Sequence, residues 1–149
     1  MKKIIKLVVV ASIIISLIVY GKSIFGLSGA NDSIKTKVQL VKESLKKSGY
    51  TPKWVVISEK RSEKFNSLLS NSAKKSHHLC GNAIDVFIID IDGDGNFNQK
   101  DLDIVAIHNK KVEKNNPKLK GGFGTYTSKD IAKRMIHFDT RGYSVVYNY

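Results

Sequence analysis

Apolar residues recur at helical spacing in the segment that begins near residue 31. Ile34, Val38, Val41 and Leu45 are separated by three or four positions, which places them on one face of an α-helix. Polar residues before Ile34 supply candidate N-caps, and Gly49 is a typical residue just beyond a helix end. We therefore predict a helix whose apolar stripe packs on a sheet and whose charged face is solvated.

Alternating and continuous apolar runs predict the remaining elements. Long β-branched runs favour strands, whereas a serine followed by a polar and apolar mixture favours a capped helix. Taken in order along the chain, the predicted helices and strands give an α+β fold class. We predict strands over residues 54–58, 83–89, 135–139 and 144–147, with helices over 62–69 and 99–113.

One acidic residue lies inside the most apolar of these strands. Asp85 is embedded in the run over residues 83–89, and a buried carboxylate is costly unless a cation or hydrogen-bond donors compensate it. Two imidazoles offer a shared explanation, because His78 precedes this strand and His137 lies in a later one. Catalytic zinc typically takes three protein ligands of these types and keeps one open position. The residues thus predict a zinc site formed by His78, Asp85 and His137.

The sequence around these residues resembles a known family. Ser76-x-His78-x-x-Gly81-x-Ala83-x-Asp85 matches the S-x-H-x-x-G-x-A-x-D motif of zinc D-alanyl-D-alanine carboxypeptidases and related murein endopeptidases. Residues 57–62 are similar to that family's S-G-Y-R-S segment, with its glycine and tyrosine replaced. Residues 121–126 and 137–142 resemble the G-G-x-G-x-Y and H-x-D-x-R elements of its small, single-domain branch. The resemblance implies a hedgehog/DD-peptidase-like fold, with an antiparallel sheet and flanking helices.

The same resemblance implies roles for residues beside the ligands. Arg61 matches the family's arginine and would steady an oxyanion or a substrate carboxylate, although a surface salt bridge is an equally good reading. Ser76 would hydrogen-bond the substrate. The glutamate that better-known members use as general base is replaced by Arg134. Because side chains alternate along a strand, Asp139 shares a face with His137 and is the best candidate base; its alternative role is support of a ligand.

Residues 90–101 contain a second cation signal. Calcium-binding loops of the EF-hand type supply oxygen ligands at positions 1, 3, 5, 7, 9 and 12, with glycine at position 6. A helix is expected to follow, as in dockerin-like loops, and a plain acidic turn is the alternative. Aspartate at position 12 indicates modest affinity, and the expected role is structural. The residues at the ligand positions are Asp90, Asp92, Asp94, Asn96, Asn98 and Asp101.

The first 30 residues differ in composition from the rest. Three lysines precede an apolar run over residues 7–20, and small residues follow up to Ala30. This is the order of a secretory signal peptide, and we predict cleavage after Ala30. An uncleaved membrane anchor is the alternative, although the run is short for a bilayer-spanning helix. Residues 31–149 are expected to form one exported domain that is periplasmic, wall-associated or secreted.

Charge and cysteine content narrow the partners. The first 30 residues carry four lysines and no acid, so 21 basic and 13 acidic side chains remain. The lysines are dispersed and lack interleaved aromatic residues, which argues against nucleic acid and favours anionic wall polymer, or simply a soluble basic surface. Cys80 is the only cysteine, so no intramolecular disulfide forms. We expect it to be a small buried side chain.

Together these features predict a zinc-dependent peptidase that acts on D-alanine-containing peptidoglycan peptides, with zinc and calcium as its metals. The expected protein is monomeric, and it contacts the membrane only through an uncleaved N-terminal segment. The alternative is a non-catalytic metal-binding module that recognises wall peptide or another partner. The remaining histidines, His77 and His108, are expected to be bystanders.

Overall fold

The computed structural model describes residues 28–69, 73–126 and 131–148. The predicted signal segment, except for residues 28–30, therefore lies outside the described residues. Among the helices that are described, none has the length and hydropathy to span a membrane. The elements are α2 (Asp32–Lys47), β1 (Lys53–Ser58), α3 (Glu63–Leu68), β2 (Ala83–Asp90), α4 (Gln99–Asn115), η1 (Pro117–Leu119), β3 (Gly122–Thr125), η2 (Ile131–Arg134), β4 (Met135–Asp139) and β5 (Val145–Asn148).

The strands form one mixed sheet in the order β1-β2-β4-β3-β5. The first three adjacent pairs are antiparallel, whereas β5 runs parallel to β3. The α+β class is therefore confirmed, but the expectation of a purely antiparallel sheet is wrong. The reason is that the chain returns from β4 past β3 before it enters β5, so β5 joins the sheet in the direction of β3.

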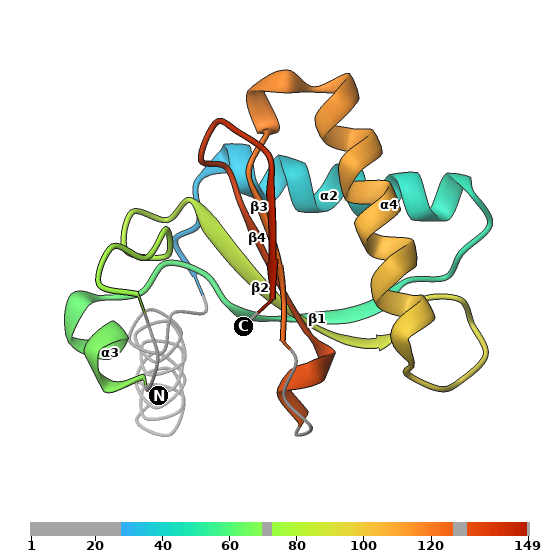
Figure 1. The fold of residues 1–149 in the computed structure, drawn as a ribbon, viewed down its shortest axis with the longest axis horizontal. Helices are drawn as coiled ribbons and strands as arrows, with labels where there is room; N and C mark the ends of the chain where they lie inside the picture. Colours follow the sequence, from blue (N-terminus) through green and yellow to red (C-terminus); the bar gives the residue numbers. More distant parts are fainter. Residues whose placement is uncertain (1–27, 70–72, 127–130, 149) are drawn as a thin grey trace, which may run out of the picture.

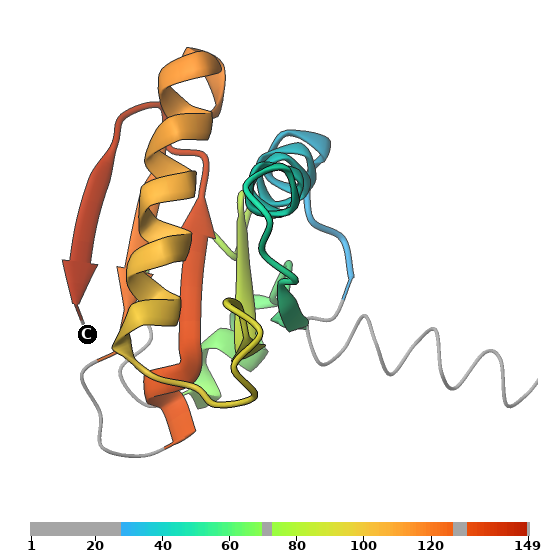
Figure 2. The same ribbon diagram turned by 90° about the vertical axis from the view of Figure 1, so that its right-hand side faces the viewer.

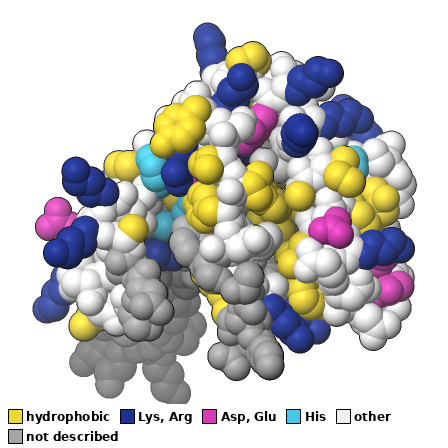
Figure 3. Space-filling model, viewed as in Figure 1, with side chains coloured by type: hydrophobic (Ala, Val, Ile, Leu, Met, Phe, Trp, Pro, Cys, Tyr) yellow, Lys and Arg dark blue, Asp and Glu magenta, His cyan; other side chains and the backbone are white. Residues whose placement is uncertain are grey.

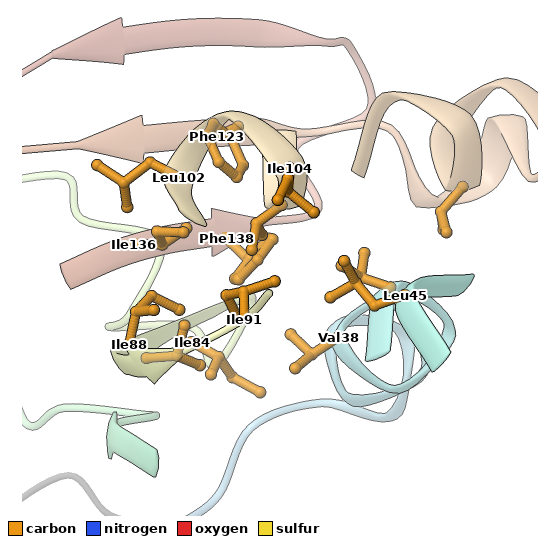
Figure 4. Packing of buried hydrophobic residues seen from close by; sticks show 14 of the residues in the cluster. Val38, Leu45, Ile84, Ile88, Ile91, Leu102, Ile104, Phe123, Ile136 and Phe138 are labelled. Atoms are coloured by element: carbon orange, nitrogen blue, oxygen red, sulfur yellow. The ribbon is translucent and has the colours of Figure 1, made fainter. Parts of the chain in front are cut away.

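Helices α2 and α4 pack on one face of this sheet. In Figures 1 and 2, α4 lies lengthwise beside the strands while α2 crosses them, and α3 lies at the opposite end of the molecule from α4. The apolar stripe predicted for α2 is confirmed, because Ile34, Val41 and Leu45 are fully buried. Figure 4 shows this stripe facing the side chains of β2 and β4. Burial of each such side chain contributes about 1.5–3 kcal/mol to folding.

The charged face of α2 is not entirely solvated. Lys37 is completely buried, and its Nζ donates to Glu113 Oε1 at 2.6 Å and to the carbonyl oxygen of Asp139 at 2.8 Å. Burial lowers the pKa of Lys37, while the adjacent Glu113 carboxylate opposes that effect. A charge can be buried here because it is both paired and hydrogen-bonded. The pair ties α2 to α4 and to the end of β4.

Alternation along the central strands separates two environments. Ile136 and Phe138 of β4 point into the core beneath the helices, whereas His137 and Asp139 belong to the other face. In β2, Val86 belongs to the core and its neighbour Asp85 to the second face. Asp85, His137 and Asp139 therefore share the sheet face that α2 and α4 do not cover.

Ala30 belongs to the folded domain. Its side chain is 5% exposed within the core, and its N–H donates to Glu59 Oε2 at 3.1 Å. The next residue, Asn31, donates its N–H to the carbonyl of Gly81 at 2.8 Å. Cleavage after Ala30 would thus remove a core residue.

Candidate metal centre

Strand pairing brings two of the predicted zinc ligands together. Asp85 of β2 lies directly opposite His137 of β4 in the antiparallel register, so both side chains project from the same face. His78 comes from the turn before β2. Its position depends on Gly81, which has φ +73° and would place a Cβ 2.8 Å from the carbonyl oxygen of Gly29. This explains why the motif requires glycine at that point.

The three side chains converge on one point and are almost fully buried. His78 Nε2 lies 3.2 Å from His137 Nδ1 and 3.1 Å from Asp85 Oδ1, and His137 Nδ1 lies 2.8 Å from Asp85 Oδ1. Ligand atoms arranged tetrahedrally about 2.0–2.1 Å from a zinc ion lie about 3.3 Å from one another. The triangle is slightly tighter than that, and its chemistry and dimensions fit zinc. The three ligands have exposures of 2%, 1% and 5%.

Contacts behind the imidazoles set their tautomers. His78 Nδ1 donates to the carbonyl oxygen of Glu59 at 2.6 Å, and His137 Nε2 lies 3.2 Å from Asp139 Oδ2. Both oxygens are acceptors, so each outer nitrogen carries the proton in the neutral ring. The lone pairs of His78 and His137 therefore point at Asp85, and three acceptors meet. Such a cluster requires a cation or a proton between its members.

Electrostatics in the cluster favour a charged carboxylate. Without a metal, a proton shared with the imidazoles takes the place of the cation: burial would raise the pKa of Asp85, but hydrogen bonds from His137 and His78 outweigh burial and hold that pKa well below its usual range. Burial lowers the pKa of His137, whereas hydrogen bonds to Asp139 and Asp85 more than offset this and raise it. The site thus keeps negative charge in a buried position, which is the electrostatic condition for binding a divalent cation.

Arg61 contacts the candidate ligand Asp85 rather than an open surface. Its Nη2 donates to Asp85 Oδ2, its Nε donates to Ser58 Oγ at 2.8 Å, and its backbone N–H donates to the carbonyl of His78 at 3.0 Å. The side chain of Arg61 is 13% exposed. It therefore orients Asp85, leaving Oδ1 for the metal, and is neither a surface ion pair nor directed at a substrate in this structure.

Ser76 and Asp139 are also held by the protein. Ser76 Oγ accepts from the N–H of His78 at 3.3 Å, which stabilises the turn before the ligand. Asp139 shares the face of His137 as predicted, but its carboxylate accepts from Arg141 through Nε and Nη2 and from the Gly122 N–H at 2.7 Å. Burial would raise the pKa of Asp139, but His137 and then Arg141 lower it strongly. This geometry favours the supporting role over the role of base.

Two glycines leave space for Asp139, a packing requirement that the sequence alone did not predict. A Cβ on Gly122 would lie 2.4 Å from Asp139 Oδ2, and one on Gly121 would lie 1.8 Å from the Asp139 carbonyl oxygen. Tyr147 of β5 also reaches this cluster, with its ring centroid 6.0 Å from that of His137. The glycine pair at 121–122 and the later His137-x-Asp139 element, both part of the family resemblance, were the only sequence signal of this contact.

Of the two bystander histidines, one lies near the centre. His77 is half-buried, and its Nδ1 is buried without a hydrogen-bond partner among the described residues. Burial lowers its pKa, and the charges of Asp139 and Arg141 also act on it. His108 lies instead between α4 and α2, where its Nδ1 is 2.8 Å from Ser44 Oγ. In Figure 3, histidine surface is visible beside the lobe that carries α3.

Cys80 is exposed, so the expectation of a buried thiol is wrong. It lies in the turn between His78 and β2, and its Sγ donates to the carbonyl of His77 at 3.3 Å. In this turn the side chain of His78 points into the protein, and the side chain of Cys80, two residues later, points outward.

The acidic loop brings three of its predicted ligands together. Carboxylate oxygens of Asp90, Asp92 and Asp94 all lie within 4.8 Å of one another, and Gly95 at position 6 has φ +84°. Each carboxylate accepts a backbone N–H from within the loop. Lys53 Nζ lies 3.0 Å from Asp90 Oδ2, and Lys100 pairs with Asp92 at 2.8 Å.

The other predicted calcium ligands are used differently. Asp101 accepts from the N–H groups of Ile91 and Asn98, both at 2.8 Å, and Asn98 Oδ1 accepts from the Lys100 N–H at 2.8 Å. These contacts form a capping box at the start of α4. Asn96 Nδ2 donates to the Asp94 carbonyl at 3.3 Å. Asp101 is therefore turned toward the backbone and does not join the three clustered carboxylates.

Comparison with known proteins returned no match to a family model, to a curated protein or to a solved structure.

Proposed function

We propose that this chain is a zinc-dependent peptidase that cleaves D-alanine-containing peptides of peptidoglycan, as a carboxypeptidase or an endopeptidase. The observation that carries the proposal is the buried triangle of His78 Nε2, Asp85 Oδ1 and His137 Nδ1, with both imidazole tautomers set from behind. Its support is the motif Ser76 to Asp85, which resembles that of the zinc D-alanyl-D-alanine peptidases. We also propose that the domain has the hedgehog/DD-peptidase fold.

Zinc held by these three residues would supply Lewis-acid polarisation of a peptide carbonyl and activation of water. Arg61 binds Oδ2 of Asp85 and so would leave Oδ1 for the metal. Asp139 keeps the proton of His137 on Nε2, and Arg141 keeps Asp139 charged. These residues would bind and orient the metal, and none of them is placed to exchange protons with a substrate.

Proton transfer is better assigned to His77 than to Asp139. The carboxylate of Asp139 is occupied by Arg141, Gly122 and His137 and is fully buried. Burial lowers the pKa of His77, the charges of Asp139 and Arg141 also act on it, and its Nδ1 has no hydrogen-bond partner among the described residues. A neutral imidazole beside the centre is suited to general base catalysis. We therefore assign Nδ1 of His77 as the proton acceptor of the proposed reaction.

The alternative function is a non-catalytic module that holds zinc and binds wall peptide or another partner. The observation that favours it is the position of the Arg134 side chain. This arginine stands where better-known peptidases have their glutamate base. Its guanidinium lies 4.9 Å from the ring centroid of Phe97 and 5.8 Å from that of Phe87, a cation–π arrangement. Arg134 thus packs against aromatic rings and supplies no base.

We further propose that the loop over residues 90–101 binds calcium in a structural role. Its support is the cluster of Asp90, Asp92 and Asp94 and the positive φ at Gly95. Asn96 remains a candidate ligand through its backbone carbonyl, which is the usual contribution of position 7. Asn98 and Asp101 would have to exchange helix-capping bonds for metal contacts. The loop joins β2 to α4, so a bound ion would tether these elements.

The proposed setting is outside the cytoplasm. A cleaved signal segment would release a monomeric domain to the periplasm, the wall or the medium, where anionic peptidoglycan peptides are available to a basic protein. Nucleic acid is not a proposed partner. An uncleaved segment would be the only contact with a membrane.

The test is muropeptide analysis of purified sacculi incubated with the zinc-loaded protein, with chelator-treated protein and with His137→Ala. Released D-alanine or shortened cross-linked peptides with the zinc-loaded protein alone support the peptidase. If zinc-loaded protein sediments with sacculi but releases nothing, the peptidase proposal fails and the module replaces it. If it neither binds nor cleaves, the peptidase and a module that recognises wall peptide both fail.

A further inference from the structure

A groove of about 570 Å³ lies between α4 and β5. Its walls are mainly apolar and include Ile107, Phe123, Val145 and Val146. The volume falls in the range of about 300–1,000 Å³ that is usual for ligand sites. Ile107 and Val146 are 64% and 73% exposed, which is unusual for large apolar side chains. Figure 3 shows hydrophobic side chains gathered near the centre of this face.

The groove and the candidate metal centre lie on opposite faces of the sheet. Val146 is the register partner of Phe123, whose side chain belongs to the core under the helices. Tyr147 and His137 both lie beside Gly124 in their respective strand pairs, on the other face. A ligand in the groove would therefore contact neither His137 nor the other proposed zinc ligands.

One wall of the groove is an unpaired strand edge. β5 is the last strand of the described sheet, and only β3 pairs with it there. The Val145 N–H donates to the Gly121 carbonyl at 3.2 Å, toward β3. Since backbone groups alternate in direction along a strand, those of Val146 and Asn148 point to the outer edge. Such an edge is a template for another extended chain.

Charge and hydrogen-bonding groups around the groove specify its occupant further. Lys110, Lys114 and Lys120 line it; all three are exposed and form no ion pair among the described residues. Asn109 also lines it and is 4% exposed. Its Nδ2 donates to Glu113 Oε1 at 3.3 Å, whereas its Oδ1 has no partner among the described atoms. A buried acceptor without a partner calls for a donor from a ligand.

We propose that this groove binds an extended acidic peptide segment of a partner protein, which joins the sheet as a strand beside β5. Backbone groups of the peptide would pair with the outer edge of β5, and alternate apolar side chains would enter the groove. Acidic side chains would face the three lysines, and a peptide donor would satisfy Asn109 Oδ1. This inference is independent of the proposed zinc chemistry, because the groove lies on the other sheet face.

A peptide explains more of these features than an anionic amphiphile does. An alkyl chain with an anionic head would use the apolar walls and the lysines, but it would leave the edge of β5 unpaired. Parallel or antiparallel strand addition uses the apolar walls, the charge and the backbone groups together. The two occupants differ in one measurable respect, since only the peptide depends on backbone hydrogen bonds.

The probes are blocked hexapeptides in which Val, Ile or Leu alternates with Glu, and a matched set with Lys in place of Glu. Binding is measured by fluorescence polarisation with the full chain. We expect members of the acidic set to bind at least about tenfold more tightly than their basic counterparts. Lys110→Glu with Lys114→Glu should remove that preference, while the control Lys35→Glu with Lys46→Glu on α2 should retain it.

Backbone N-methylation of the tightest peptide separates pairing from simple insertion. Methylation at every second nitrogen blocks one edge of the peptide, so one of the two methylated isomers should lose at least about tenfold in affinity while the other retains binding. The proposal is overturned if no acidic peptide binds, if neither isomer loses affinity, or if dodecanoate binds and displaces the peptide without any effect of N-methylation. Circular dichroism of each protein variant establishes that it is folded.

Discussion

The two candidate cation sites of this protein are constructed in opposite ways. The zinc triangle combines residues from three separate segments, is almost fully buried, and is oriented by Glu59, Arg61 and Asp139 from behind. The acidic loop is a single contiguous stretch, is partly exposed, and already pairs with two lysines. The first is a preorganised site that the fold determines, whereas the second depends on local turns and must release lysines to bind an ion.

Energetics follow from this difference. Three buried acceptors are unfavourable unless a cation or a proton lies between them, so the fold favours a positive charge at this point. The loop carboxylates accept backbone N–H groups, and two of them pair with lysines, so the loop is satisfied without an ion. We therefore expect tight binding at the triangle and weak, mainly stabilising binding at the loop. The following experiments test this contrast.

Loss of a zinc ligand should produce the largest effect. His137→Ala removes one of three ligands, and zinc affinity should fall by more than the roughly 10–100-fold typical for groups behind a ligand. The control His108→Ala should keep zinc, because His108 bonds Ser44 between the helices. Competition with a chromogenic chelator measures both. Equal zinc affinities for wild type and His137→Ala would contradict the site.

Asp139→Asn should weaken zinc binding by roughly 10–100-fold, because the asparagine cannot hold the His137 proton as a carboxylate does. Hydrolysis of peptidoglycan should fall with zinc occupancy and recover at high zinc. His77→Gln should instead keep zinc and lower hydrolysis by roughly 10²–10⁴-fold. The control Asp32→Asn, an exposed acid in the first turn of α2, should change neither. Full zinc affinity in Asp139→Asn with lost hydrolysis would identify Asp139 as the base.

Calcium should raise the thermal midpoint, because an ion that binds only the folded state stabilises it. At about 100 times the dissociation constant the gain is about 2.7 kcal/mol. Asp92→Ala with Asp94→Ala should abolish the increment, while Asp103→Ala, outside the loop, should retain it. Superimposable melting curves of the wild type in calcium and in chelator would show that the loop is a plain acidic turn.

The smallest expected effect is a difference between the two sites in the pH dependence of metal binding. The pKa of His137 is raised, so a proton competes with zinc for Nδ1, and zinc affinity should increase from pH 6 to pH 8 by at most about tenfold per pH unit. The carboxyl pKa values of Asp90 and Asp92 are lowered by Lys53 and Lys100. These groups are ionised throughout, so calcium stabilisation should stay constant. Zinc titrations at three pH values measure this, and a flat response would contradict coordination by the imidazoles.

Much of the fold could be predicted because its helices and central strands follow clear periodicities. The strand predicted over residues 135–139 coincides with β4, and α4 begins at the predicted residue 99. β3 was missed, since Gly122 and Gly124 lack the apolar alternation of a strand. Its extended form comes from pairing with β4 and β5 and from the space that Asp139 requires. These are tertiary causes, so no local pattern reports them.

The ligands were easier to predict than their support. His78, Asp85 and His137 are chemically distinctive residue types, and the structure brings all three together. The contact of Arg61 with Asp85 and the burial of Lys37 depend on which strands and helices become neighbours. In the loop, the spacing identified the carboxylates that cluster. It did not predict that Asp101 bonds backbone N–H groups at the start of α4, because the same residue can serve either as an ion ligand or as part of a helix cap.

Zinc K-edge X-ray absorption of the protein loaded with one equivalent of zinc tests the central claim most directly. The account predicts a nitrogen and oxygen shell about 2.0–2.1 Å from zinc, with imidazole scattering that diminishes in His137→Ala. A sulfur shell at about 2.3 Å would instead place zinc on Cys80. That result, or an absorption spectrum unchanged by His137→Ala, would contradict a zinc centre at His78, Asp85 and His137.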